Sequence, residues 1–257
     1  SCKAYWINTS SNSIIRQLVE KSDENTKRMI ENLMSGGSVK AAINENSVYS
    51  DIDVNKEIIW SFLLFTGYLK QINTELVNKR IVSEMVIPNL EVQTVYEETI
   101  QNWFEDEVER EGTGLLLKAM LEEKPEEVEN EISKWLQKSI SYHDTLENFY
   151  HGFLVGLLEG FKGYEVKSNR ENRDGRTDIT VCERYNRKAA IVIEIKPAET
   201  FKQLKTQCEN AVKQIRDNKY AEQFTDDCYQ KVISYGISFY GKTCRVKMGE
   251  TLYQTEE

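Results

Sequence analysis

A short stretch of apolar residues near position 190 restricts the fold more strongly than any other part of the chain. Residues 191–195 are all aliphatic except Glu194. Apolar residues at nearly every position are typical of a central strand in a sheet that is covered on both faces. We therefore expect a sheet with helices packed against it.

The segments around this stretch follow the order αβββαβ. An apolar run over 144–161 predicts a buried helix, and a second helix with apolar residues on one side begins near Phe201. Strand-like patterns, separated by turn signals, cover 164–170, 177–183, 190–196, 231–240 and 243–248. A helical crossover between strands implies a mixed sheet flanked by helices, so the expected fold class is α/β.

The N-terminal third is predicted to be mostly helical. Apolar residues recur at helical spacing in this part, whereas 79–88 fits either a strand or an extended connector. Pro88 marks the expected boundary between a helical region, 1–88, and a second domain, 89–257. Within the second domain we expect an acidic helical layer over 89–143 and the αβββαβ core over 144–250.

The balance of charge excludes one broad class of function. The chain has 33 Lys and Arg against 42 Asp and Glu, which gives a net charge of −9 at pH 7. A uniformly basic coat for nucleic acid is therefore excluded, but a local basic face is not. The C-terminal part of the chain, residues 148–257, has 18 basic and 16 acidic side chains and therefore a slightly positive net charge.

The sequence predicts neither membrane insertion nor secretion. The mean hydropathy is −0.56, and the longest apolar stretch, 58–65, is too short to span a membrane. The first residues lack the hydrophobic core of a signal peptide, and the missing initiator Met suggests a piece of a longer protein. Five dispersed cysteines fit reduced thiols in the cytoplasm better than disulfides or a zinc site. Chemistry is therefore expected on carboxylates, lysine, arginine and hydroxyls.

Three charged residues on the predicted sheet form the candidate site. Glu194 and Lys196 are two residues apart on one strand, so their side chains share a face. Charged groups on an apolar strand are costly unless they are paired or used. An antiparallel hairpin could bring Asp178 beside Glu194, and two carboxylates at a strand end suit a hard divalent cation. The alternative is a structural ion pair between Glu194 and Lys196 at the sheet edge.

The spacing of these residues resembles the PD-(D/E)XK nuclease superfamily. The resemblance rests on two motifs, Gly175-Arg176-Thr177-Asp178 and, sixteen residues after the aspartate, Glu194-Ile195-Lys196. The resemblance implies a restriction-endonuclease-like core with the order αβββαβ. This order agrees with the helices and strands that the sequence pattern predicts. Thr177 stands where the superfamily pattern has proline.

A longer set of motifs is similar to one bacterial branch of uncharacterised proteins within that superfamily. These motifs are ENFYH at 147–151, SNRE at 168–171, GRTD at 175–178, IEIK at 193–196 and YGISF at 235–239. In that branch an AAA-ATPase-like domain precedes the nuclease-like domain, and the first 75 residues here resemble its tail. No GxxxxGK[ST] phosphate loop is present, so any ATPase machinery is expected upstream, absent from this chain.

The resemblance also implies roles for individual residues. Asp178 and Glu194 would bind Mg²⁺ or Mn²⁺, and Lys196 would orient the attacking water or stabilise the developing charge. Accessory positions are Glu147, His151, Glu171, Gln214 and Tyr220, and nucleic-acid contacts are Arg176, Lys202 and Lys205.

Several of these assignments keep an ordinary structural alternative. His151 is expected to be hydrogen-bonded to Glu147 on the same helix face rather than to bind metal. Glu171 is either an accessory ligand or a hairpin cap. Lys202 and Lys205 belong either to a solvated helix face or to a basic stripe along a nucleic-acid backbone.

Two functions follow from the sequence. The first is a metal-dependent phosphodiesterase acting on nucleic acid, with DNA favoured over RNA. The second is a catalytically inactive nuclease-fold module that binds nucleic acid or a protein partner. No feature of the sequence fixes the oligomeric state.

Overall fold

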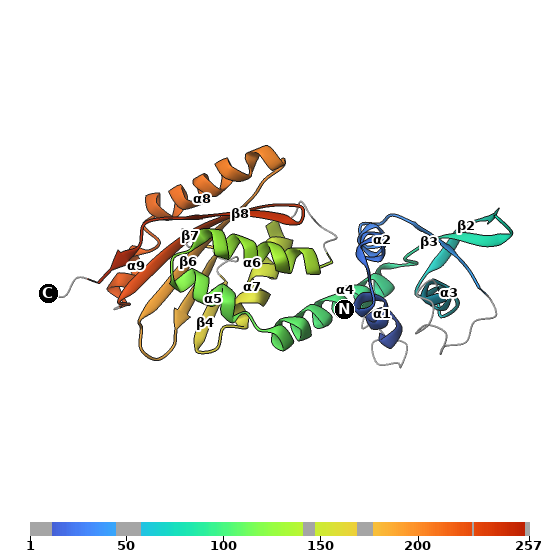
Figure 1. Ribbon diagram of the computed structural model, residues 1–257, viewed down its shortest axis with the longest axis horizontal. Coiled ribbons are helices and arrows are strands. Elements are labelled where there is room, and N and C mark those ends of the chain that lie inside the picture. The colour runs from blue at the N-terminus through green and yellow to red at the C-terminus, as the bar shows by residue number, and fades with distance from the viewer. Residues whose placement is uncertain (1–11, 45–57, 141–146, 169–176, 228, 255–257) are drawn as a thin grey trace. The chain divides into compact units, whose positions relative to one another are not determined.

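A computed structural model describes residues 12–44, 58–140, 147–168, 177–227 and 229–254 (Figure 1). The chain divides into two compact units, Ser1–Asp106 and Glu107–Glu257. The division falls within a long helix, eighteen residues after the expected boundary at Pro88. Each unit is described separately below.

The first unit combines helices with a small antiparallel sheet. Its helices are α1 (Asn12–Glu20), α2 (Glu24–Met34), α3 (Ile58–Phe65) and the first part of α4 (Leu90–Glu111). Its strands are β1 (Val39–Ala42), β2 (Lys70–Val77) and β3 (Arg80–Val86), which pair in the order β1-β3-β2. Helices α2 and α3 contact β1, and Met85 of β3 and Leu63 of α3 are both fully buried.

The segment 79–88, left open between strand and connector, contains strand β3. A two-residue turn joins β2 to β3, in which Asn78 and Lys79 have φ values of 51° and 63°. Such a turn normally carries Asn-Gly, because both positions need left-handed backbone. Every residue of β2 is exposed, and its sequence, KQINTELV, does not alternate regularly between apolar and polar residues. The sequence therefore gave no signal for β2.

The second unit contains a mixed sheet. Its strands are β4 (Tyr164–Ser168), β5 (Ile179–Glu183), β6 (Ala189–Pro197), β7 (Lys231–Tyr240), β8 (Thr243–Met248) and β9 (Leu252–Tyr253). The order is β4-β5-β6-β7-β8, with β9 also on β7, and the pair β6–β7 is parallel whereas the others are antiparallel. A parallel pair needs a long crossover, which here contains helix α8 (Leu204–Asp217). The expected α/β class and mixed sheet are confirmed.

Helices cover both faces of this sheet, as the apolar strand required. The remaining helices are α5 (Gly114–Leu121), α6 (Pro125–Lys138), α7 (Glu147–Glu159), the single turn η2 (Phe201–Gln203) and α9 (Glu222–Asp226). On β7, the Tyr235 hydroxyl donates to the Met120 carbonyl of α5 at 2.8 Å, and Phe239 stacks on Tyr150 of α7 at 4.6 Å between ring centroids.

Helix α8 occupies the opposite face of the sheet (Figure 1). Gly236 lies between Tyr235 and Ile237 on β7 and therefore faces the other way. A Cβ at Gly236 would lie 2.6 Å from the Cys208 carbonyl oxygen of α8. The glycine thus allows α8 to lie close against β7 and β6.

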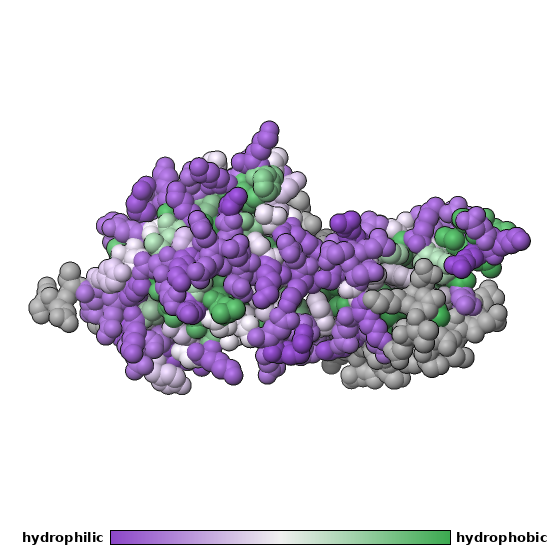
Figure 2. All heavy atoms as spheres, in the orientation of Figure 1, coloured by the Kyte–Doolittle hydropathy of each residue, from purple (hydrophilic) through white to green (hydrophobic). Residues whose placement is uncertain are grey.

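The visible face of the molecule is mostly polar (Figure 2), and none of the described helices could span a membrane. On the face shown in Figure 2, hydrophilic side chains cover most of the visible surface. Among the described residues, no helix has both the length and the apolar character needed to cross a bilayer.

Candidate functional site

The strand register brings Asp178 next to the strand that carries Glu194 and Lys196. In the antiparallel β5–β6 pair, Ile179 lies opposite Ile193. Asp178 directly precedes Ile179, so the same register places it near Glu194. The Asp178 carboxylate Oδ2 accepts a hydrogen bond from the Ile195 amide at 2.7 Å. Its side chain therefore lies against the β6 backbone between Glu194 and Lys196.

Residues around Asp178 fix its backbone. The buried Thr177 hydroxyl donates to the Ile193 carbonyl at 2.7 Å. On α7, His151 Nε2 lies 3.3 Å from the Asp178 carbonyl oxygen and 3.3 Å from Ser168 Oγ on β4. A carbonyl oxygen can only accept, so the contact with Asp178 requires hydrogen on Nε2. Three elements thus hold the start of β5 in place.

Glu194 and Lys196 share the sheet face that α8 covers. Glu194 is only 3% exposed, and its Oε1 accepts a hydrogen bond from Gln214 Nε2 on α8. Lys196 is partly buried and takes part in none of the ion pairs found among the described residues. The alternative of a structural Glu194–Lys196 ion pair is therefore not seen in that part of the chain.

The donor set fits a hard divalent cation. Asp178 and Glu194 offer carboxylate oxygens, and Mg²⁺ is commonly bound by one or two carboxylates while it keeps several waters. Within the described ranges, no group of three or more His, Cys, Asp or Glu side chains is placed to hold an ion. The two carboxylates therefore suit Mg²⁺ or Mn²⁺, whereas the ligand set of a structural zinc site is not found there.

Residues 145–249 match the family model of the PD-(D/E)XK nuclease superfamily. The matched part, called the nuclease-like segment below, includes α7, α8 and strands β4–β8, and it contains Asp178, Glu194 and Lys196. Its mixed sheet and flanking helices agree with a restriction-endonuclease-like fold. A comparison with curated proteins finds no match.

The structure places Tyr220 away from the other candidate residues. Its ring is buried in an apolar cluster with Cys182 and Ala190, at the opposite end of β6 from Lys196. Its hydroxyl accepts a hydrogen bond from Asn218 Nδ2 at 2.7 Å. Lys219, with a φ of 57°, turns the chain at the end of α8, so Tyr220 does not continue the helix face of Gln214.

Of the other site residues predicted from the sequence, some lie within the described ranges and some do not. His151 is buried and contacts the Asp178 backbone. Lys202 and Lys205 are exposed at the beginning of the α8 region. Glu171 and Arg176 fall outside the described residues, as does the Glu147 side chain, so the expected His151–Glu147 hydrogen bond stays a prediction.

The sequence interpretation assigned no role to Thr177 or Ser168. Thr177 was noted only because it replaces a proline, yet it ties the Asp178 segment to β6. Its position directly before Asp178 was the available signal. Ser168 lay within a motif, but its contact with His151 depends on how α7 packs against β4.

The described cysteines of the nuclease-like segment are core residues. Cys182, Cys208 and Cys244 are free and buried. Burial raises the pKa of Cys208 to about 12, and its thiol donates to the Gly236 carbonyl at 3.0 Å. A neutral thiol that is already bonded is a poor nucleophile, in agreement with carboxylate-based chemistry.

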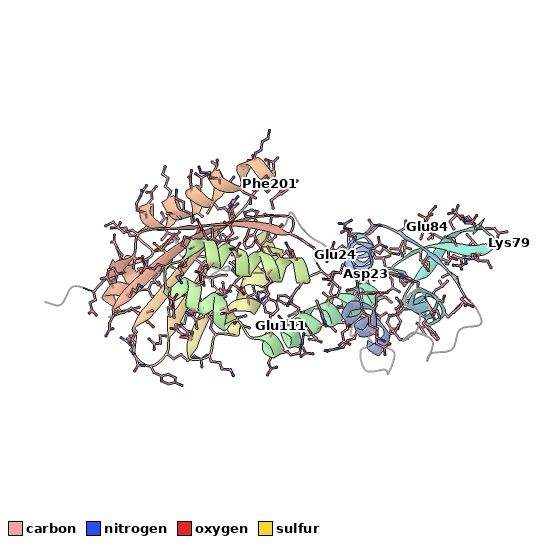
Figure 3. The ribbon with its side chains drawn as sticks, viewed as in Figure 1. Asp23, Glu24, Lys79, Glu84, Glu111 and Phe201 are labelled. Carbon is pink, nitrogen blue, oxygen red and sulfur yellow. The ribbon has the colours of Figure 1, made fainter. Side chains whose placement is uncertain are left out.

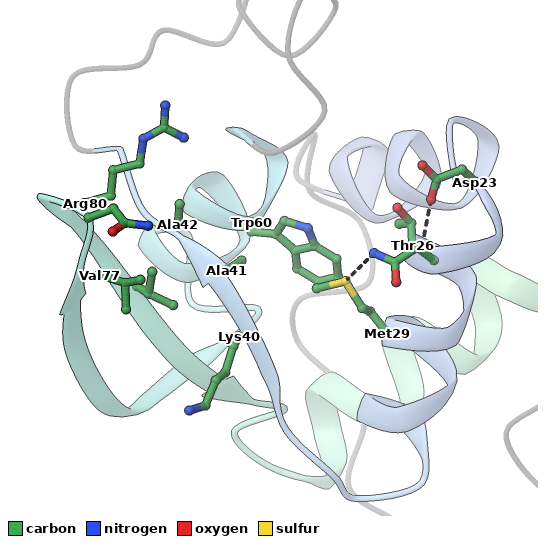
Figure 4. Close-up of a pocket in the computed structure, with 12 residues that line it drawn as sticks. Asp23, Thr26, Met29, Lys40, Ala41, Ala42, Trp60, Val77 and Arg80 are labelled. Atoms are coloured by element: carbon green, nitrogen blue, oxygen red, sulfur yellow. Dashed lines mark hydrogen bonds between the residues drawn. The ribbon is translucent and has the colours of Figure 1, made fainter.

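A separate cavity lies within the first unit. It has a volume of about 680 Å³ and lies between α2, β1 and the β2–β3 turn (Figure 4). Among its described lining residues, Asp23 is the one carboxylate, and it caps α2 through the Thr26 amide. Lys40 at this cavity is paired with Glu75 at 3.0 Å. The cavity thus lacks the paired carboxylates found in the nuclease-like segment.

Proposed function

We propose that the nuclease-like segment hydrolyses phosphodiester bonds in nucleic acid, with DNA favoured over RNA, and that Asp178 and Glu194 hold Mg²⁺ or Mn²⁺. The observation that carries the proposal is the 2.7 Å hydrogen bond from the Ile195 amide to Asp178 Oδ2. It sets one carboxylate directly beside the strand that presents Glu194 and Lys196. The match over residues 145–249 supports the same reaction class.

Each residue has a distinct part in this proposal. A divalent ion, when bound, supplies positive charge that neutralises the phosphate and makes water more acidic. Asp178 is held through Ile195 and Glu194 through Gln214, so the two carboxylates are positioned before substrate arrives. Lys196 has no ion-pair partner among the described residues, so its ammonium is able to orient the attacking water and stabilise charge on the phosphate.

We also infer the context of the chain from its sequence. The resemblance of the first 75 residues to the tail of an AAA-ATPase-like domain supports an ATPase-like partner domain upstream in a bacterial protein. The three free, buried cysteines support a reducing compartment such as the cytoplasm.

A second function has a specific observation in its favour. The Gln214 amide already occupies Glu194 Oε1, and no third acidic ligand joins Asp178 and Glu194 within the described ranges. A nuclease-fold module that binds nucleic acid or a protein partner without cutting is compatible with this arrangement. Such a module would bind DNA with a steep salt dependence and show no Mn²⁺ dependence.

A cleavage assay separates the two functions. The purified chain is incubated with Mg²⁺ or Mn²⁺ and with labelled single-stranded and duplex DNA and RNA. Hydrolysis should require the ion and should be abolished by Glu194→Ala. Glu165→Ala is the control, because this carboxylate is half exposed on β4, two strands away from Glu194 on β6. Full activity in Glu194→Ala would refute the proposed mechanism.

A further inference from the structure

An exposed aromatic side chain lies beside the candidate site. Phe201 is 59% exposed and begins the short turn η2 that leads into α8 (Figure 3). The turn is capped, because the Thr200 and Gln203 side chains form a reciprocal cap in which the Thr200 amide donates to Gln203 Oε1 at 3.0 Å. A large apolar ring is thus held in solvent by a well-formed structure.

Phe201 lies at the end of β6 that carries the candidate site. It follows Lys196 by five residues, which span at most about 18 Å when fully extended. The Ala198 amide still donates to the Phe239 carbonyl at 2.8 Å, so the chain stays on the sheet beyond the end of β6. Phe201 therefore lies at the same end of β6 as Lys196.

The segment around Phe201 has more basic than acidic residues, and its exposed lysines form no ion pair among the described residues. Between residues 196 and 205 the chain has three lysines and one acidic residue, Glu199. Lys202 and Lys205 are exposed and belong to none of the ion pairs of the described residues. Further along, Arg216 and Lys219 are paired with Asp217 and Glu222, and Lys247 of β8 is paired with Glu209 of α8. The unpaired lysines of η2 and early α8 thus cluster beside the aromatic ring.

One side of α8 links Phe201 to the candidate site with neutral amides. Gln207 and Gln214 are seven residues apart and therefore lie on one face of the helix. Gln214 contacts Glu194, and Asn210 Nδ2 donates to Gln207 Oε1 at 3.3 Å. Carboxamides can donate hydrogen bonds to phosphate or base atoms without repelling a polyanion.

We propose that Phe201 is a stacking platform for an unpaired base and that Lys202 and Lys205 contact the adjoining phosphates. The nuclease-like segment then takes single-stranded nucleic acid, or a frayed end, rather than intact duplex. The reason is geometric, since base faces within a duplex are covered by their neighbours whereas a single strand presents them to an aromatic ring. This inference rests on the proposed function and specifies its substrate class.

The test is a binding measurement by fluorescence anisotropy. A fluorescein-labelled DNA oligonucleotide, single-stranded or annealed to its complement, is titrated with the whole chain in EDTA, which prevents cutting. Single strands should bind more tightly than duplex, and Phe201→Ala should raise the single-strand Kd by roughly 5- to 150-fold. Phe201→Trp keeps an aromatic face and should keep the affinity.

The control is Tyr185→Ala. Tyr185 is 81% exposed in the β5–β6 turn, at the other end of β6, and its removal should leave single-strand binding unchanged. Equal single-strand binding by Phe201→Ala and wild type, or tighter binding of duplex by wild type, would overturn the inference.

Cleavage assays keep this result separate from the proposed function. Metal-dependent cutting of duplex and single strand at equal rates, unaffected by Phe201→Ala, would overturn the inference and leave the nuclease function standing. Phe201-dependent binding without any metal-dependent cutting would support the stacking site and overturn hydrolysis. Failure to bind either form in EDTA would overturn the inference, whereas the hydrolytic function is decided by the cleavage assay with Mg²⁺ or Mn²⁺.

Discussion

Gln214 of α8 donates a hydrogen bond to the buried carboxylate of Glu194 on β6. The contact joins the crossover helix to the strand at the centre of the candidate site. A group that orients a metal ligand typically changes metal affinity by about 10- to 100-fold when it is removed. In the proposed metal site, Gln214 would therefore act through Glu194.

We predict that Gln214→Ala weakens Mn²⁺ binding by about 10-fold or more, measured by isothermal titration calorimetry. The same variant should lose about 1–3 kcal/mol of stability, because it removes the hydrogen bond from Gln214 to the buried Glu194 side chain. Thr206→Ala, at an exposed position of α8, controls for the change in the helix. Unchanged Mn²⁺ affinity in Gln214→Ala would show that Glu194 does not depend on this contact.

Thr177 should stabilise the β5–β6 hairpin through its hydroxyl. Thr177→Val keeps the shape but leaves the Ile193 carbonyl without this donor, which should cost about 1–3 kcal/mol in the free energy of unfolding by urea. Thr177→Ser keeps the hydroxyl and should lose less. Equal stability of the Val and Ser variants would contradict the proposed role.

Gly236 should be required for the packing of α8 on the sheet. In Gly236→Ala the new Cβ would meet the Cys208 carbonyl at 2.6 Å, and overpacking of this kind destabilises by roughly 1–3 kcal/mol. Gly152→Ala is the matched control, because Gly152 is exposed in α7 with no neighbouring atom within 4 Å. The control should gain roughly 0.5–1 kcal/mol from better helix propensity, so thermal denaturation should move the two variants in opposite directions.

One ion pair in the second unit should make stability depend on pH. Lys231 lies 2.5 Å from Glu123, and its hydrogen bond holds the pKa of the Glu123 carboxyl below the usual 4.5. A lowered carboxyl pKa stabilises the fold above the unfolded value, and this contribution is lost as the pH falls through the folded value. Glu123→Gln should therefore lower stability at neutral pH and flatten its fall in acid, as measured by urea denaturation between pH 7 and pH 3.

The central sheet could be predicted from the sequence because its strands differ sharply from its helices. The aliphatic run around Ile193 is typical of a central strand covered on both faces, and the hairpin before it limits where Asp178 can lie. The antiparallel pairing of β5 with β6, which brings Asp178 near Glu194, follows from those two facts. The contact of Gln214 with Glu194 needed the position of α8 as well, which spacing alone did not give.

Strand β2 and the position of Tyr220 were hard to predict for the same physical reason, namely backbone turns without glycine. Asn78 and Lys79 adopt left-handed backbone between β2 and β3, and Lys219 does so after α8. Left-handed conformations at lysine are uncommon, so the sequence shows no sign of these turns. Strand β2 was therefore not predicted, and Tyr220, an accessory position implied by the resemblance, lies after such a turn and is buried with Cys182.

The most direct test of the account is whether Asp178 and Glu194 bind one divalent ion together. Titration of Mn²⁺ followed by electron paramagnetic resonance measures the free ion in the presence of the chain. The account predicts binding by wild type and by Glu165→Gln, and a loss of affinity of about 10-fold or more in both Asp178→Asn and Glu194→Gln. Mn²⁺ binding that is equal in all four proteins would contradict a metal site at these carboxylates.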